Sequence, residues 1–159
     1  MRQFFDTNIL VYSRDPDAGA KRALARDLIG QAIDQDAFVV STQVLVEFYA
    51  TAVRRKLLGA AQALDLAWFW ARRDTVPHTP DLVLRGLALH QAHSLSVWDA
   101  LIVQAGLDAG CSLLFSEDLQ HGRRFGDLEV VNPFIAPRAD EPRAAAYSAG
   151  RVRKRRRVR

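Results

Sequence analysis

The chain begins with MRQFFDTNILVYS (residues 1–13), which places a carboxylate, a hydroxyl and an amide between two apolar segments. We predict a short buried strand at Gln3–Phe5 and the first turn of a helix at Ile9–Ser13. Asp6 is then either an ordinary helix cap or turn residue, or a functional carboxylate at the carboxyl end of a central strand, where open α/β sheets place their ligands. The remaining residues have to distinguish these two interpretations.

The following segments alternate between helical and strand-like patterns. Helical periodicity predicts helices at Lys21–Gln35, Thr42–Leu58, Ala60–Arg73, Asp81–His93 and Val97–Ala109. Thr42 is expected to cap the second of these helices and Gly59 to end it. Apolar runs predict strands at 37–41, 111–116 and 128–134, with a brief edge segment at 75–80. Such alternation predicts an α/β fold whose mostly parallel sheet is covered by helices on both faces.

The composition indicates one folded domain with a basic extension. A length of 159 residues, with 49% hydrophobic and 25% charged residues, is typical of one globular domain. Residues 151–159 contain seven of the 22 basic residues and no acidic one, which leaves 15 basic and 18 acidic residues elsewhere. After Pro137 the apolar periodicity ends. We therefore predict a folded domain over residues 1–136 and a basic, disordered tail over residues 137–159.

Several features of the sequence bear on the compartment. No apolar run approaches the roughly 18 residues that a membrane span needs, and the first residues lack the pattern of a signal peptide. The single cysteine, Cys111, cannot form an internal disulfide and is predicted to be a small buried residue. These features predict a cytoplasmic protein that does not associate with membranes.

Asp99 is the acid whose position is hardest to explain structurally. Leu95, Ile102 and Val103 are its neighbours at helical spacing. Ser96, three residues earlier, completes an S-x-x-D capping pattern, which explains the location but not an ionised group along an apolar face. An unpaired buried carboxylate costs several kcal/mol or becomes protonated, and a cation would remove that cost. We therefore favour a functional role for Asp99.

Two other acids are ambiguous when each is considered alone. Glu47 shares a polar helix face with Arg54, and an exposed charge paired with Arg54 is the simpler explanation. Asp118 follows the strand CSLLFS and can cap the turn before LQHG. In a parallel α/β fold, however, these acids can converge with Asp6 and Asp99 at one edge of the sheet.

A cluster of four carboxylates has consequences for chemistry. The charges repel strongly unless a divalent ion lies among them. Ligands that are all oxygen favour Mg²⁺ or Mn²⁺ over zinc. Such a site suits metal-assisted attack of water on a phosphodiester.

Four segments resemble the PIN-domain ribonucleases, and most of all the toxin half of VapBC toxin–antitoxin pairs. They are FFDTNILVYS with Asp6, STQVLVEFY with Glu47, LSVWDALIVQAGLDAGC with Asp99, and LLFSEDLQHG…VVNPF with Asp118. The resemblance covers about residues 4–134. It implies a three-layer α/β/α domain in which these four acids hold Mg²⁺ or Mn²⁺ and cut RNA endonucleolytically.

The resemblance also implies further residues of the site. Asn8, together with Ser116 or Thr42, falls on supporting polar positions, and Glu117 is a candidate extra acid. Independently, the basic tail can contact RNA phosphates. The candidate residues of the tail are Arg151, Arg153, Lys154, Arg155, Arg156 and Arg157.

The implied partners are an RNA substrate, a VapB-type antitoxin and a second copy of the chain. Such an antitoxin would cover the acidic site, with a basic side chain among the carboxylates. Trp68, Phe69 and Trp70 place aromatic surface on more than one face of a predicted helix. Core packing explains some of these rings, and a homodimer or antitoxin contact is a candidate explanation for the others.

Three alternatives fit the sequence less well than a metal-dependent nuclease. A receiver-type phospho-acceptor domain would need an acidic pair after the first strand and a lysine after a late strand, and neither is present. A non-catalytic RNA-binding module of the same fold would not need all four acids. A zinc site at His90 and His93 lacks cysteine and other close ligands, so a polar helix end explains this pair better.

Overall fold

Short runs of apolar residues form one six-stranded sheet in the computed structural model, which describes residues 1–135. The strands are β1 (Gln3–Phe5), β2 (Phe38–Ser41), β3 (Asp74–Val76), β4 (Leu113–Phe115), β5 (Arg124–Phe125) and β6 (Leu128–Val131). Their order is β3-β2-β1-β4-β6-β5, and every neighbouring pair is parallel except β5 and β6. The predicted α/β fold with a mostly parallel sheet is therefore confirmed.

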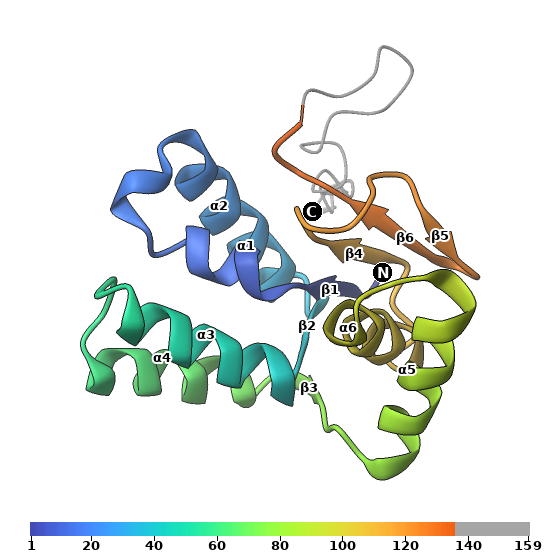
Figure 1. The fold of residues 1–159 in the computed structure, drawn as a ribbon. Helices are drawn as coiled ribbons and strands as arrows, with labels where there is room; N and C mark the ends of the chain where they lie inside the picture. Colours follow the sequence, from blue (N-terminus) through green and yellow to red (C-terminus); the bar gives the residue numbers. More distant parts are fainter. Residues whose placement is uncertain (136–159) are drawn as a thin grey trace, which may run out of the picture.

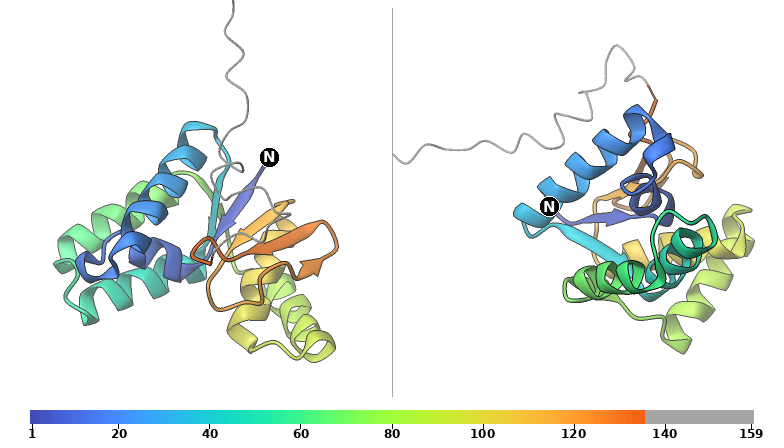
Figure 2. Two further views of the ribbon diagram at one scale, coloured as in Figure 1. Left: turned by 90° about the horizontal axis from the view of Figure 1, so that it is seen from above. Right: turned by 90° about the vertical axis from the view of Figure 1, so that its left-hand side faces the viewer.

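The helices form two groups with the sheet between them (Figure 1 and Figure 2). The first group contains α1 (Thr7–Tyr12), the 3₁₀ turn η1 (Pro16–Ala18), α2 (Ala20–Asp34), α3 (Thr42–Arg54) and α4 (Ala60–Ala71). The second contains α5 (Pro80–His93) and α6 (Val97–Asp108). Within residues 1–135, no helix has both the length and the apolar character of a membrane span. The predicted tail, with its candidate RNA contacts, lies outside the described residues and stays a prediction.

The two central strands, β1 and β4, are buried and determine where the site lies. The Phe5 ring lies 5.0 Å from that of Phe38 and 5.2 Å from that of Phe115, measured between centroids. Burying one such side chain contributes roughly 1.5–3 kcal/mol, so this packing strongly favours the observed pairing of the strands. Beyond β1, the Asp6 N–H donates to the Phe115 carbonyl at 3.0 Å. Asp6 and Ser116, the residues that follow β1 and β4, therefore lie side by side.

The start of α3 differs from the prediction in its capping residue. Ser41 rather than Thr42 is the N-cap, and its hydroxyl accepts a hydrogen bond from the Val44 N–H at 3.4 Å. The Thr42 hydroxyl instead accepts from the His78 N–H at 3.1 Å. The prediction was wrong by one residue because the two adjacent hydroxyl side chains are both favourable caps.

The end of α3 also differs from the prediction. The helix ends at Arg54, and Lys56 has a positive φ of 55°, which breaks the helical geometry before Gly59 is reached. Gly59 is instead the N-cap of α4, and its N–H donates to Gln62 Oε1 at 3.2 Å. A glycine between two helical patterns can serve either helix, which is why its role was predicted incorrectly.

No strand was predicted at residues 124–125, where β5 lies. This strand has two residues, too few for a periodic pattern, and it pairs antiparallel with β6. The two-residue connection contains Gly126, whose φ of 57° suits a tight hairpin turn. The hairpin lies at one edge of the sheet, next to β4.

Candidate active site

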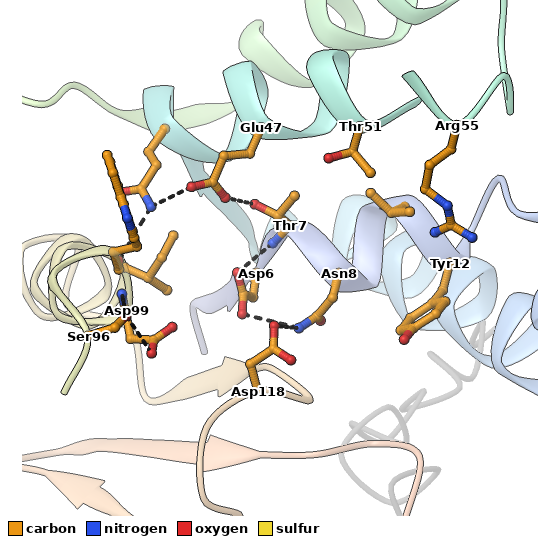
Figure 3. Close-up of a pocket in the computed structure, with 14 residues that line it drawn as sticks. Asp6, Thr7, Asn8, Tyr12, Glu47, Thr51, Arg55, Ser96, Asp99 and Asp118 are labelled. Carbon is orange, nitrogen blue, oxygen red and sulfur yellow. Dashed lines mark hydrogen bonds between the residues drawn. The ribbon is translucent and has the colours of Figure 1, made fainter. Parts of the chain in front are cut away.

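The carboxyl ends of the central strands and the helices α1, α3 and α6 surround one open pocket of about 540 Å³ (Figure 3). All four predicted acids line it: Asp6, Glu47, Asp99 and Asp118. They come from four segments that are far apart in the sequence. The segments meet because parallel strands direct the residues that follow them to the same edge of the sheet.

Asp6 is the most buried of the four acids, with 6% of its surface exposed. As the N-cap of α1, it accepts the Thr7 N–H on Oδ1 at 2.6 Å. Its Oδ2 accepts from the Ser116 hydroxyl at 2.6 Å and from Asn8 Nδ2 at 3.3 Å. Burial raises the pKa of Asp6 to about 7; the hydrogen bonds oppose this rise, and two neighbouring carboxylates add to it. Asp6 therefore caps α1 and also places in the pocket a carboxylate whose charged form is energetically unfavourable because it is buried.

Glu47 faces Asp6 across the pocket from α3 (Figure 3). Its Oε2 accepts from the Thr7 hydroxyl at 2.5 Å, and its Oε1 accepts from Gln43 Nε2 at 2.8 Å. Within residues 1–135 it forms no ion pair, so pairing with Arg54, the simpler explanation in the sequence, is not observed. Two neutral donors thus hold the carboxylate in place without neutralising its charge.

Asp99 lies in the first turn of α6, and Ser96 is the N-cap of that helix, as predicted. The Ser96 hydroxyl accepts from the Asp99 N–H at 3.0 Å and donates to its Oδ2 at 2.7 Å. The side chain is partly rather than fully buried, because it points into the open pocket. The cap explains one oxygen of Asp99 and leaves the other available to a ligand.

Asp118 follows β4 and approaches Asp6 through Asn8. Asn8 Nδ2 donates to Asp118 Oδ2 at 3.0 Å and, less closely, to Asp6. The Asn8 Oδ1 atom is buried and has no hydrogen-bond partner. Ser116 completes the arrangement, because its hydroxyl accepts from the Asp118 N–H at 3.2 Å while it donates to Asp6. Asn8 and Ser116 thus position two of the acids.

Of the predicted supporting residues, Asn8 lines this pocket, whereas Ser116, Thr42 and Glu117 do not. Thr42 lines a neighbouring pocket. Glu117 accepts from the Tyr12 hydroxyl at 2.5 Å and forms an ion pair with Lys21. Burial alone would raise the pKa of Glu117, but the contacts with Lys21 and Tyr12 outweigh it and hold this pKa below its usual range. Glu117 is therefore committed to a contact between α1, α2 and the loop after β4.

Sequence reasoning missed three residues that shape the pocket: Thr7, Gln43 and Arg55. Thr7 had a signal in the sequence, because it directly follows Asp6. Among the described residues, Arg55 is the only basic side chain that lines the pocket, and its Nη2 contacts Asp15 Oδ2 at 2.6 Å. Figure 3 shows Arg55 and Asp99 at opposite ends of the pocket. Arg55 was not predicted because Asp15, its partner, is 40 residues away.

The donor set of the pocket fits a hard divalent cation that retains water. Carboxylate oxygens surround the pocket, and the unpartnered buried oxygens Asn8 Oδ1 and Gln43 Oε1 belong to residues that line it. Nevertheless, no three His, Cys, Asp or Glu side chains within residues 1–135 lie close enough together to hold one ion. Mg²⁺ commonly binds through one or two carboxylates and keeps several waters, so the observed spacing is compatible with it.

The sequence matches one protein-family model. The model of the PIN domain matches residues 4–125, which include the strands β2 to β5, most of β1 and all four acids, whereas β6 lies beyond the matched residues. No curated protein matches the sequence.

Three solved structures show the same fold at low sequence identity. VapC20 of Mycobacterium tuberculosis, a toxin that cleaves the sarcin–ricin loop, is 20% identical with a TM-score of 0.57, over 73% of this chain and 89% of that chain. A chain of a toxin–antitoxin complex from Klebsiella pneumoniae is 19% identical with a TM-score of 0.57, and the match covers 79% of this chain and 94% of that chain. A chain of VapBC2 of Rickettsia felis, which was solved bound to a DNA fragment from its promoter, is 16% identical with a TM-score of 0.61. The match covers 82% of this chain and 97% of that chain.

Proposed function

Because the chain belongs to the PIN domain family, we propose that it is an endoribonuclease that hydrolyses RNA phosphodiester bonds with Mg²⁺ or Mn²⁺. The observation that carries this proposal is the convergence of Asp6, Glu47, Asp99 and Asp118 around one pocket. The match to the PIN domain also argues against the receiver-type phospho-acceptor domain. A non-catalytic RNA-binding role would leave unexplained why a carboxylate as buried as Asp6 is kept beside other acids.

The acids and the neutral residues beside them would have different roles in the reaction. The four acids would hold the ion, directly or through its water molecules. When bound, the ion would neutralise their charge and polarise the phosphodiester. Thr7 and Gln43 orient Glu47 through their hydrogen bonds. Asn8 and Ser116 position Asp6 and Asp118. These neutral donors fix the carboxylates before substrate binds, which reduces the reorganisation needed during the reaction.

Replacing Arg55 should weaken RNA binding more than it slows cleavage. Arg55 lies at the end of the pocket opposite Asp99, and we expect it to contact a phosphate that flanks the cleaved bond. Arg55→Gln should raise KM several-fold and lower the slope of log affinity against log salt by about one. Arg54→Gln is the matched control, because Arg54 is the preceding exposed arginine and does not line the pocket. Equal effects of the two substitutions would contradict the role of Arg55.

We further propose that the nuclease is a cytoplasmic VapC-type toxin with a VapB-type antitoxin and a homodimeric state. The fold that it shares with the toxin–antitoxin structures supports this role. Trp70 is 1% exposed and packs edge-on against Phe48, so it belongs to the core. Trp68 and Phe69 remain exposed on α4 and are candidates for a contact with a second copy or the antitoxin.

Expression of the chain alone should arrest growth, and co-expression of the antitoxin from the adjacent gene should relieve the arrest. The two proteins should also co-purify, because a basic antitoxin side chain can neutralise the clustered carboxylates. Growth curves and affinity purification measure both effects. The Asp99→Asn variant is the control, since it should be harmless without the antitoxin. Absence of both co-purification and relief would contradict the toxin role.

A further inference from the structure

A second, mostly apolar pocket adjoins the carboxylate pocket. It has a volume of about 580 Å³ and is lined by Thr42, Gln43, Val46, Glu47, His78 and Trp98. Three of these residues, Gln43, Glu47 and Trp98, also line the carboxylate pocket. A group bound in the second pocket would therefore lie directly beside a group bound among the acids.

Trp98 gives this second pocket a large flat surface. It immediately precedes Asp99 on α6, and 66% of its surface is exposed. Val46 on α3 is exposed to a similar extent. Gln43 Nε2 lies 3.4 Å from the Trp98 carbonyl and also donates to Glu47, so it links the Trp98 backbone to an acid of the site. The backbone that carries the indole thus has a defined position relative to Glu47.

The chemistry of the second pocket favours a neutral, planar ligand. No Lys or Arg within residues 1–135 lines it, so it lacks the side chains that bind phosphate most strongly. Two of its residues carry buried polar atoms without hydrogen-bond partners, Gln43 Oε1 and His78 Nε2. An apolar surface with unsatisfied polar atoms beside it matches a nucleobase, which has an apolar face and a polar edge.

We propose that an unpaired base of the RNA substrate stacks on the Trp98 indole, next to the phosphate that is cut, with its edge toward Gln43 and His78. This inference rests on the proposed ribonuclease function and assigns the substrate class as single-stranded RNA, because only an unpaired base exposes its face. An antitoxin helix fits less well. It would need a row of apolar anchors, whereas Val46 and Trp98 are the only large apolar side chains lining this pocket in the described residues.

The test compares binding of two probes of equal length: oligouridylate, and the same ribose-phosphate chain without bases. Binding is measured by fluorescence anisotropy with Mn²⁺ in the Asp99→Asn background, in which cleavage of the RNA should be too slow to disturb the measurement. Adding Trp98→Leu should weaken oligouridylate binding about tenfold or more and leave the abasic probe unaffected. Trp98→Phe should recover part of the loss because it retains a ring. Trp68→Leu is the matched control, since Trp68 is 60% exposed and lines neither pocket.

Cleavage kinetics of the same variants, with Asp99 intact, provide a second measurement. Trp98→Leu should raise KM more than it lowers kcat, whereas a purely structural defect would lower the melting temperature. Equal binding of oligouridylate by Trp98→Leu and Trp68→Leu would overturn the stacking role. Loss of antitoxin capture with unchanged RNA binding would likewise overturn it, and would assign the surface to protein. Neither result would affect the ribonuclease function, which fails only if the wild-type chain does not cut RNA.

Discussion

Asp99→Asn should lower RNA cleavage by about a hundredfold or more while the protein stays folded. The amide keeps the shape of the side chain and can still accept a hydrogen bond from the Ser96 hydroxyl. The backbone cap of α6 does not depend on the carboxylate, because the Ser96 hydroxyl accepts the Asp99 N–H. If Asp99 were only a capping residue, stability would fall by about 1 kcal/mol or less and cleavage would survive. If it is a metal ligand, metal affinity and cleavage fall together.

The measurement is the cleavage rate against Mn²⁺ concentration, together with melting temperatures in the presence and absence of EDTA. In EDTA the variant should melt slightly above the wild type, because one repulsive charge has been removed. Asp108→Asn is the control on the same helix, since Asp108 pairs with Arg85 and does not line the pocket. It should lower the melting temperature and leave cleavage intact. A wild-type cleavage rate for Asp99→Asn would refute the proposed metal site.

Asp6→Asn should stabilise the metal-free protein at pH 8 by on the order of 3 kcal/mol and abolish cleavage. The pKa of Asp6 is raised from 3.8 to about 7 by burial, so the folded state binds a proton that the unfolded state has already lost. Protonation of Asp6 therefore stabilises the fold fully below about pH 4, and this contribution is lost as the pH rises toward 7. Asparagine carries no charge at any of these pH values, so the variant does not lose this stability as the pH rises.

Denaturant unfolding at pH 5 and pH 8, with and without Mn²⁺, tests this expectation. In EDTA the wild type should lose stability between the two pH values, and Asp6→Asn should lose much less. Mn²⁺ should restore the wild type at pH 8 and have little effect on the variant, because an ion needs the charged carboxylate. Cleavage by the wild type should rise as the pH passes 7 for the same reason. Equal pH dependence of the two proteins in EDTA would contradict the role of burial.

The fold was predictable where hydrophobic patterns repeat over several residues. The apolar runs around Phe4 and Leu114 predicted the central strands, and the acids that follow them predicted the edge of the sheet at which the pocket lies. The start of α3 and the role of Gly59 were predicted incorrectly, because adjacent or shared capping residues look equivalent in the sequence. The strand β5 is too short to carry a pattern.

Contacts between distant residues account for the parts of the site that the sequence does not reveal. Thr7 is 40 residues from Glu47, and nothing in either segment indicates that the Thr7 hydroxyl donates a hydrogen bond to Glu47. Tyr12 and Glu117 are separated by 105 residues. The second pocket brings Trp98 beside residues of α3 such as Gln43, 55 residues away, so in the sequence an exposed Trp98 looks like one more apolar residue of a helix.

The pairing of β1 with β4 has a consequence for the time at which the carboxylate pocket can form during synthesis of the chain. β1 is translated well before its partner β4, which ends at Phe115, and the last of the four acids is Asp118. Until that part of the chain has emerged, Asp6 has neither the Ser116 hydroxyl nor the neighbouring strand that positions it. A nascent chain therefore cannot assemble the site while most of the domain is still being translated, so the proposed nuclease activity would begin only after that.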